Sequence, residues 1–398
     1  MSVEVIDRSP DLKRLRDEGY AIEITQSAHL LVHDVPYVDR ERRIRRGTLV
    51  SPLHLVVEGG ERTMRPKDHQ VWFIGTHPCT KDGEEISGIK HSSGELSLAE
   101  GLVAQHSFSN KPIGGYPDYY EKMVRYATII SAEAKAIDPT VDPRTYRPIE
   151  AEEGDGPFWY LDTASSRAGI AFVSNKIAHG GSLGIIGVGG TGAYILDLVA
   201  KTPAPEIHIF DDDTFFQHNA FRAPSAAGMD ELRAHPTKVG YFSALYSKMH
   251  RKIIAHEYRI TSANVEELRE LGFVFLCLDS GPAKRAIANA LIGWGIPFID
   301  TGIGVGLLKD TMQLSAICRA TFVTPAMNEH VERRIPFADV ADNNLYETNI
   351  QVADLNALVA TLAVIKWKKH AGFYLDLERE HDSTYSTCSN LLTSDEQR

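Results

Sequence analysis

The stretch "GIIGVGGTGA", residues 184–193, has glycines spaced as in phosphate-binding loops. Gly187, Gly189 and Gly192 form a GxGxxG pattern, and Gly190 is an additional glycine. The pattern lies between an expected strand, "LGII", and an expected helix, "TGAYILDLVAK". Backbone N–H groups at the start of such a helix bind phosphate oxygens, and glycines let the ligand approach. The stretch predicts a nucleotide site, but the pattern alone does not separate NAD from ATP.

Polar residues farther along the chain bear on the identity of the nucleotide. Asp211 ends the second expected strand, "EIHIFD", where a carboxylate can bind the ribose hydroxyls of either nucleotide. Asp213, Asn219 and Arg222 follow in "DDDTFFQHNAFR", and Lys238 follows in "HPTKVG". Two cations and an amide near the glycine loop suit a triphosphate. These residues favour ATP.

Asp279 ends the third expected strand, "FVFLCLD", at the carboxyl edge of the sheet. One or two carboxylates together with phosphate oxygens form the usual protein site for Mg²⁺. We therefore expect ATP and magnesium as cofactors. Each of these residues alone could be a helix cap or a solvated charge. An NAD-dependent oxidoreductase and a nucleotide-binding scaffold without turnover remain the alternatives.

Strands and helices alternate in the second part of the chain. Expected strands cover 183–187, 206–211, 273–279 and 296–302, with helical segments between them. This order predicts an α/β fold with a doubly wound, mostly parallel sheet. The segment "VADLNALVATLAVIKWKKH" is expected to form a long closing helix.

A proline-rich, acidic segment divides the chain. Residues 139–157 contain four prolines and several acidic and glycine residues, which is typical of a linker. We expect a smaller, strand-rich α+β domain at residues 1–138 and the nucleotide-binding domain at residues 158–398.

Composition excludes several classes of protein. With 398 residues and 43% hydrophobic residues the chain can bury a large core, and a net charge of −11 argues against a nucleic-acid-binding protein. No apolar run is long enough to cross a membrane, and a polar N-terminus predicts a cytoplasmic protein. Four cysteines without a CxxC pair indicate neither a disulfide framework nor structural zinc. The basic run "RERRIRR" is expected to be a solvated face or a docking patch.

The motifs together resemble the ThiF/MoeB-like adenylating family, which is related to ubiquitin-activating enzymes. The family pattern is GxGGxG, then DxDxVxxxNLxRQ after a strand, then a lysine, then a strand ending in aspartate. Here it is "GVGGTG", "DDDTFFQHNAFR", Lys238 and "CLDS", with Ala223 in place of the family glutamine. The resemblance covers about residues 160–392. It is closest to a bacterial form with a fused N-terminal domain of unknown function.

The resemblance implies an enzyme that uses ATP to adenylate the C-terminal carboxylate of a ubiquitin-like protein. The reaction needs no enzymatic nucleophile, because the carboxylate itself attacks the α-phosphorus and pyrophosphate leaves. A ubiquitin-like protein, through its C-terminal tail, and a conjugating-enzyme-like protein are the implied partners, and a homodimer is the implied assembly. The N-terminal domain would recognise one of these partners.

The resemblance also implies roles for individual residues. Asp211 would bind the ribose, Asp279 would bind magnesium, and Arg167 would be supplied from before the glycine loop, across the dimer interface. The phosphates would be held by the glycine loop and by Asn219, Arg222 and Lys238.

The sequence departs from many relatives in the loop before the last helix. The segment "ADNNLYETNIQVADLNAL" contains no cysteine to take the acyl group as a thioester. The acyl group would then pass directly to a partner's nucleophile or form an oxyester on Thr348, whose hydroxyl would need activation. Cys318 is a further candidate acceptor, whereas Cys277 is expected to be a buried small hydrophobe.

Overall fold

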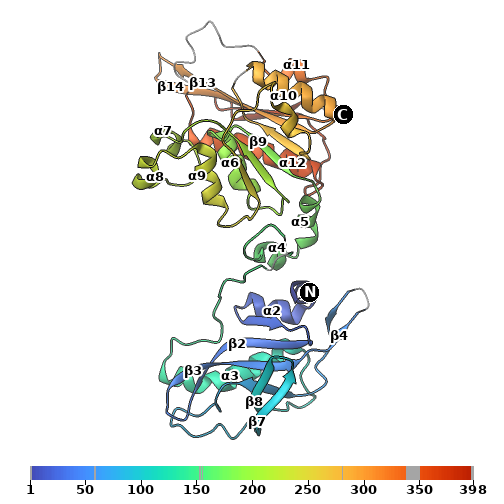
Figure 1. Ribbon diagram of the computed structural model, residues 1–398, viewed down its shortest axis with the longest axis vertical. Helices are drawn as coiled ribbons and strands as arrows, with labels where there is room; N and C mark the ends of the chain where they lie inside the picture. Colours follow the sequence, from blue (N-terminus) through green and yellow to red (C-terminus); the bar gives the residue numbers. More distant parts are fainter. Residues whose placement is uncertain are drawn as a thin grey trace. The chain divides into compact units, whose positions relative to one another are not determined.

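The computed structural model describes residues 2–57, 60–151, 154, 156–279, 281–337 and 350–395 (Figure 1). Contacts divide the chain into two compact units, Met1–Ile149 and Glu150–Arg398. This division lies inside the segment 139–157 that the sequence predicts to be a linker. The units are called unit 1 and unit 2 below.

Unit 1 is a six-stranded antiparallel sheet with a long helix against it. The strand order is β1-β2-β3-β6-β8-β7. The helix α3 (Tyr119–Ile137) begins where the side chain of Asp118 accepts a hydrogen bond from the backbone N–H of Glu121 at 2.8 Å. Its fully buried side chains, among them Met123 and Tyr126, join the core of the unit. This confirms the expected α+β, strand-rich fold.

The elements of unit 1 are α1 (Ser2–Arg8), α2 (Pro10–Asp17), β1 (Ala21–Ile24), β2 (His29–Val38), β3 (Ile44–Pro52), β4 (Leu55–Val56), β5 (Arg62–Thr63), β6 (Gln70–Ile74), β7 (Lys90–Ala99), β8 (Leu102–Ser109) and α3.

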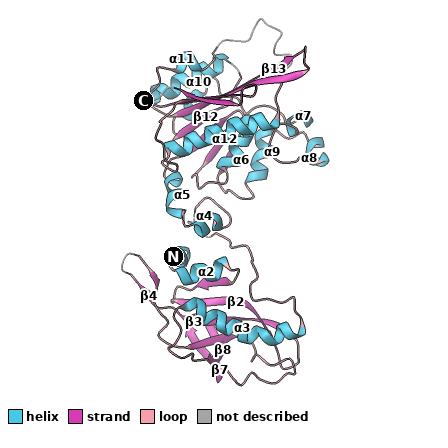
Figure 2. Cartoon of the chain, turned by 180° about the vertical axis from the view of Figure 1, so that it is seen from behind, coloured by secondary structure: helices cyan, strands magenta, loops and turns pink. Residues whose placement is uncertain are grey.

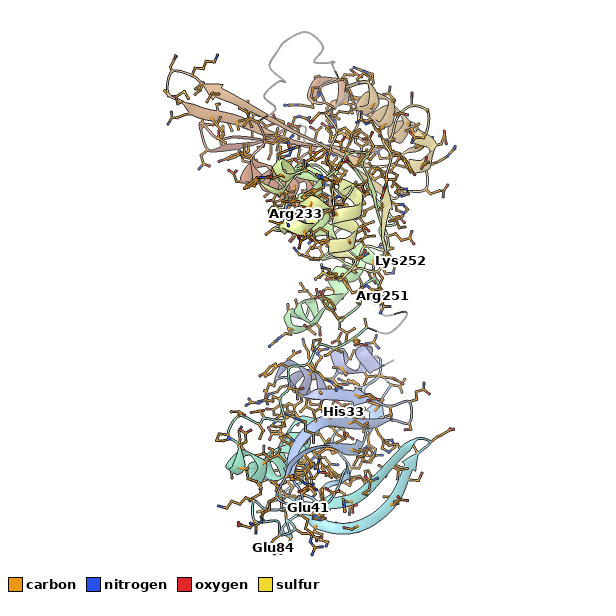
Figure 3. The ribbon with its side chains drawn as sticks, turned by 60° about the vertical axis from the view of Figure 1, so that its left-hand side comes forward. His33, Glu41, Glu84, Arg233, Arg251 and Lys252 are labelled. Atoms are coloured by element: carbon orange, nitrogen blue, oxygen red, sulfur yellow. The ribbon has the colours of Figure 1, made fainter. Side chains whose placement is uncertain are left out.

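The basic run of unit 1 surrounds a buried carboxylate. Asp39 is 3% exposed and accepts hydrogen bonds from the backbone N–H of Arg43 at 2.8 Å and from the Arg43 and Arg45 side chains at 3.1 and 3.0 Å. Glu41, labelled in Figure 3, pairs with Arg43 at 2.9 Å. Burial alone would raise the pKa of Asp39, but these hydrogen bonds hold it at about 2. Part of the basic run therefore closes the turn between β2 and β3.

Asp39→Asn is expected to destabilise unit 1 by about 1–3 kcal/mol, because the arginines lose a charged acceptor. The pKa of Asp39 lies below its usual value of 3.8. Its ionisation therefore stabilises the fold above that value, and this contribution is lost as pH falls from about 4 towards about 2. Urea unfolding, followed by amide exchange in β2 and β3, should show the difference between wild type and variant at pH 7. An equal difference at pH 3 would contradict this assignment.

Unit 2 is built on an eight-stranded sheet in the order β11-β10-β9-β12-β13-β14-β15-β16. The strands from β11 to β13 pair in parallel, and those from β13 to β16 pair antiparallel. The predicted doubly wound, mostly parallel sheet is confirmed. The sequence reasoning predicted neither β11 nor the antiparallel pairing from β13 to β16.

The elements of unit 2 are α4 (Thr163–Ala168), α5 (Ala171–Ala178), β9 (Leu183–Ile186), α6 (Thr191–Val199), β10 (Ile207–Phe210), α7 (Gln217–Ala220), α8 (Met229–Arg233), α9 (Lys238–Tyr246), β11 (Ile253–His256), η1 (Val265–Leu268), β12 (Phe273–Leu276), α10 (Gly281–Trp294), β13 (Phe298–Leu308), β14 (Gln313–Val323), α11 (Val331–Arg334), α12 (Ala353–His370), β15 (Asp382–Ser386) and β16 (Leu391–Asp395).

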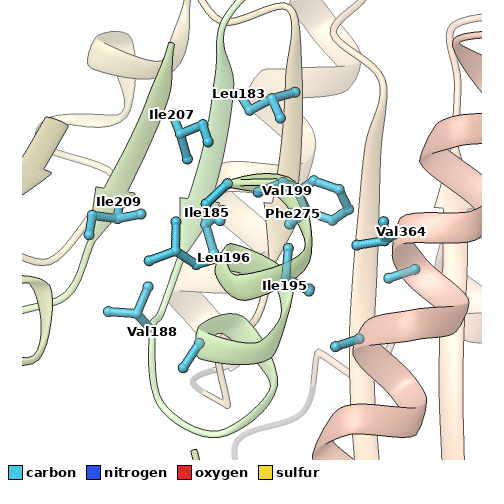
Figure 4. Close-up of a cluster of buried hydrophobic side chains, with 14 of the residues drawn as sticks. Leu183, Ile185, Val188, Ile195, Leu196, Val199, Ile207, Ile209, Phe275 and Val364 are labelled. Atoms are coloured by element: carbon cyan, nitrogen blue, oxygen red, sulfur yellow. The ribbon is translucent and has the colours of Figure 1, made fainter. Parts of the chain in front are cut away.

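Helices cover both faces of this sheet. On one face α6 and α12 lie side by side (Figure 2), and Ile185 of β9 packs with Leu196 and Val364 (Figure 4). On the other face the neighbouring Ile186 packs with Ile287 of α10. Because alternate side chains of a strand point to opposite faces, β9 is apolar throughout. Burial on both faces fixes the end of β9, and with it the position of the glycine loop.

Across the described part of the chain, no helix combines the length and apolar character needed to cross a membrane.

Candidate active site

A cavity of about 330 Å³ lies at the carboxyl ends of the parallel strands of unit 2. This is the edge of an open α/β sheet at which ligands bind. The side chains that line it include four aspartates and three cationic residues: Asp211, Asp212, Asp213, Asp279, Arg222, Lys238 and Arg259. Gly187, Gly189, Gly190 and Gly192 also line it. The cavity is therefore strongly polar at one edge of an apolar sheet.

Packing requires two of the glycines. Gly187 has a φ of +88°, and a Cβ there would lie 2.7 Å from the carbonyl oxygen of Cys277. A Cβ on Gly192 would lie 1.8 Å from the carbonyl oxygen of Gly187. Gly189 differs, because a Cβ there would meet no atom of the described structure within 4 Å. Gly187 and Gly192 thus shape the loop, whereas Gly189 borders open space in the cavity.

The additional glycine, Gly190, is explained by a residue of α12. A Cβ at this position would lie 2.2 Å from Nδ2 of Asn356. The buried Asn356 therefore occupies the space that a side chain at position 190 would need. The glycine at the fourth position of "GVGG" is therefore explained by a contact within the protein.

Asp211 is held by two backbone donors. One carboxylate oxygen accepts a hydrogen bond from the N–H of Val188 at 2.9 Å, and the other accepts one from the N–H of Asp213 at 2.9 Å. Its side chain is 9% exposed. The bond to Val188 fixes the carboxylate directly beside the glycine loop, where a ribose next to loop-bound phosphates would lie.

Lys238 bridges two of the aspartates. Its Nζ lies 2.6 Å from Oδ2 of Asp213 and 3.6 Å from Oδ1 of Asp211. The hydrogen bond from Lys238 lowers the pKa of Asp213. Lys238 is the first residue of α9, where the positive end of the helix dipole disfavours a cation. The two carboxylates offset this and hold a buried ammonium group at the cavity wall.

Two arginines complete the cationic wall. Arg222 is half-buried, and within the described residues no acceptor lies in hydrogen-bond range of its buried Nε. A buried guanidinium N–H without an acceptor is costly unless a ligand supplies one, and an oxygen anion in the cavity would do so. Arg259 donates from Nε to Asp212 at 3.1 Å. The arrangement suits a polyanion that competes with the aspartates for these cations.

The residues also fit a divalent cation. Asp279 is an exposed residue that lines the cavity, in the segment between β12 and α10. Carboxylate oxygens of Asp211, Asp212 and Asp213 lie within 4.8 Å of one another. Lys238 pairs with two of these three, Asp211 and Asp213, and Asp279 stays the magnesium ligand predicted from the sequence. Magnesium there would neutralise charge on the phosphates.

Two of the predicted site residues do not line the cavity, and a third lies outside the described residues. Asn219 is 3% exposed, and its Oδ1 accepts a hydrogen bond from the N–H of Phe216 at 2.8 Å, so it shapes the turn before Arg222. Arg167 is an exposed residue of α4 and is not among the lining residues. Thr348 lies outside the described residues.

Of the two cysteines considered, Cys277 differs from the sequence expectation, because it lines the cavity. Cys277 directly follows β12 and lines the cavity, although burial raises the pKa of its thiol to about 12. Cys318 of β14 is fully buried, and burial raises its thiol pKa to about 11. Neither thiol is poised as a thiolate at neutral pH. Cys318 is therefore unsuited to accept an acyl group.

The sequence reasoning missed Asn356, Arg259 and Gln351, all of which line the cavity. Asn356 had a signal, because an amide in the apolar stretch "LNALVATLAV" falls on the buried face of a helix. Arg259 and Gln351 had no such signal, since both lie in irregular segments.

Two family models match this chain. Residues 173–364 match the ThiF family, and residues 10–163 match a domain of unknown function, DUF6791. No match was found among curated proteins.

Solved structures with a similar fold include E. coli MccB. With MccA-N7isoASN it has a TM-score of 0.48 at 15% identity, covering 78% of this chain and 96% of that one. With ATP it has a TM-score of 0.45 at 16% identity, covering 59% and 69%. PaaA has a TM-score of 0.44 at 15% identity, covering 57% and 76%. The match to the family model shows that this chain carries a ThiF family domain at residues 173–364, preceded by an N-terminal domain of unknown function.

Proposed function

We propose that the ThiF domain uses ATP and Mg²⁺ to adenylate the C-terminal carboxylate of a ubiquitin-like protein and passes the acyl group to a conjugating-enzyme-like partner. Adenylation of a substrate carboxylate is supported by the family match. The observation that carries the proposal is the convergence of Asp211, Lys238, Arg222 and Asp279 on one cavity beside the glycine loop.

Each group has a defined part in the proposed reaction. Asp211 orients the ribose, and the N–H groups of the glycine loop hold the phosphates. An oxygen of the substrate carboxylate forms a bond to the α-phosphorus, the bond from that phosphorus to the bridging oxygen breaks, and pyrophosphate leaves. Arg222 and Lys238 stabilise the negative charge that develops on the phosphate oxygens. Magnesium, when bound at Asp279, would neutralise charge on the departing pyrophosphate.

The products are an acyl-adenylate and pyrophosphate, and the acyl carbon then needs a nucleophile. Since Cys318 is buried, we propose that a partner supplies this nucleophile, with an oxyester on Thr348 as the alternative route. Arg167 and a homodimer remain part of the proposal, because Arg167 is exposed on α4 and does not line the cavity of its own chain.

Isotope exchange between pyrophosphate and ATP tests the proposal. Wild-type protein with Mg²⁺ and a β-grasp protein that has a free C-terminal glycine should catalyse the exchange, and the same β-grasp protein with an amidated C-terminus should not. Arg222→Ala and Asp279→Ala are expected to lower the exchange rate about 10²- to 10³-fold, because each removes stabilisation of transition-state charge.

The controls separate the alternatives. Parallel titrations with ATP and NAD⁺ decide the nucleotide, and binding of NAD⁺ without ATP would favour the oxidoreductase. Tight ATP binding without any exchange would favour a scaffold. Unchanged exchange in both variants would refute the assignment of Arg222 and Asp279.

A further inference from the structure

The first turn of α12 carries a buried amide that the proposed reaction does not use directly. Asn356 is 1% exposed and lines the cavity, while its neighbours on the same helix face, Val359 and Ala360, are apolar core residues. A buried amide without partners is destabilising, so its contacts define its role.

The side chain of Asn356 joins two separate segments of the site. Its Oδ1 accepts a hydrogen bond from Oγ1 of Thr191 at 3.0 Å, and Thr191 is the first residue of α6, between Gly190 and Gly192 of the glycine loop. Its Nδ2 donates to the backbone carbonyl of Arg222 at 3.1 Å. The same Nδ2 lies against Gly190, where a Cβ would come within 2.2 Å.

We propose that Asn356 is a positioning residue that sets the phosphate-binding loop and the Arg222 segment at a fixed separation. The inference rests on the proposed function in taking ATP as the ligand. An amide is suited to this place because one end must accept and the other must donate. Leucine has nearly the same size but offers neither, so Asn356→Leu leaves the Thr191 hydroxyl and the Arg222 carbonyl without their partner.

The contacts predict which part of the nucleotide is affected. Asn356 touches the glycine loop and the Arg222 segment, whereas the ribose carboxylate of Asp211 is held by Val188 and Asp213. Loss of the amide should therefore weaken binding of the β- and γ-phosphates more than binding of the nucleoside part. A general loss of stability would weaken ATP and AMP alike.

The test is calorimetric titration of the full chain with MgATP and with AMP. For Asn356→Leu we expect the Kd for ATP to rise about tenfold and the Kd for AMP to rise less than threefold. Thr191→Val removes one of the two hydrogen bonds and should have a smaller effect in the same direction. Thr202→Val is the matched control, because that buried hydroxyl donates to the carbonyl of Val199 just beyond the other end of α6, at 2.7 Å.

Amide hydrogen exchange without nucleotide gives a second measurement that needs no activity. Faster exchange at residues 187–192 and 221–223 in Asn356→Leu, but not in Thr202→Val, is expected. Equal rises in the Kd for ATP and AMP, or unchanged exchange in both segments, would overturn the inference. If wild type bound no ATP, the proposed function would fail, and the exchange measurement would still decide the role of Asn356.

Discussion

Lys238→Met is expected to lower the rate of pyrophosphate exchange by about 10²-fold or more. The substitution removes the ammonium group that lies 2.6 Å from Asp213 and 3.6 Å from Asp211, while methionine preserves most of the side-chain volume. The cavity would then present unneutralised carboxylates to a nucleotide with about four negative charges, and like charges repel strongly in a partly buried site. Titration with MgATP and the exchange assay measure the effect, and both affinity and rate should fall.

Lys284→Met is the matched control for this experiment. Lys284 is also a buried lysine, with its Nζ 2.9 Å from the fully buried Asp300, but it does not line the cavity. Removing this lysine should lower the free energy of unfolding and leave ATP affinity unchanged, and the loss is limited because Arg319 still pairs with Asp300 at 2.5 Å. If both variants lost stability equally and neither lost affinity, Lys238 would be a structural residue.

Gly192→Ala is expected to abolish ATP binding. The added Cβ would lie 1.8 Å from the carbonyl oxygen of Gly187, which is backbone and cannot rotate away. The start of α6 or the end of β9 would have to move, and either movement displaces the N–H groups of the loop. Titration with MgATP should show no detectable binding, and the melting temperature should fall.

Gly189→Ala provides the informative contrast. No atom of the described structure lies within 4 Å of a Cβ at this position, so the fold should tolerate the methyl group. If phosphates bind against the loop, the methyl group still occupies ligand space and should weaken ATP binding about tenfold or more. A variant with unchanged melting temperature and unchanged ATP affinity would place the nucleotide elsewhere in the cavity.

The ion pairs of the cavity suggest how binding is controlled. Lys238 contacts Asp211 and Asp213, and Arg259 contacts Asp212, so two of the cations that line the cavity already have carboxylate partners. A polyphosphate must displace these carboxylates to pair with the cations. A solvated anion of lower charge competes less strongly and therefore binds less well. Arg222, with its buried Nε lacking an acceptor among the described residues, is the cation most directly poised for an anion.

Several features of unit 2 could be predicted from the sequence, because they depend on residues that are close together in the chain. The period of apolar residues and the turn glycines determine β9, the glycine loop and α6, and parallel strands place Asp211 and Asp279 at one sheet edge. The ThiF family pattern adds Arg222 and Lys238, which line the same cavity. These features follow from local spacing and from the topology of one fold class.

The sequence by itself thus determined the α/β class, and it predicted two domains and the strand-end residues of the site. Only the tertiary structure decided that Asn356 contacts Thr191, 165 residues earlier, that Asn219 does not line the cavity and that Cys277 does. The physical reason is that these contacts are set by how α12 packs on α6 and by where each strand stops pairing. These contacts depend on how the whole core packs, and the local spacing of apolar residues in the sequence does not encode them.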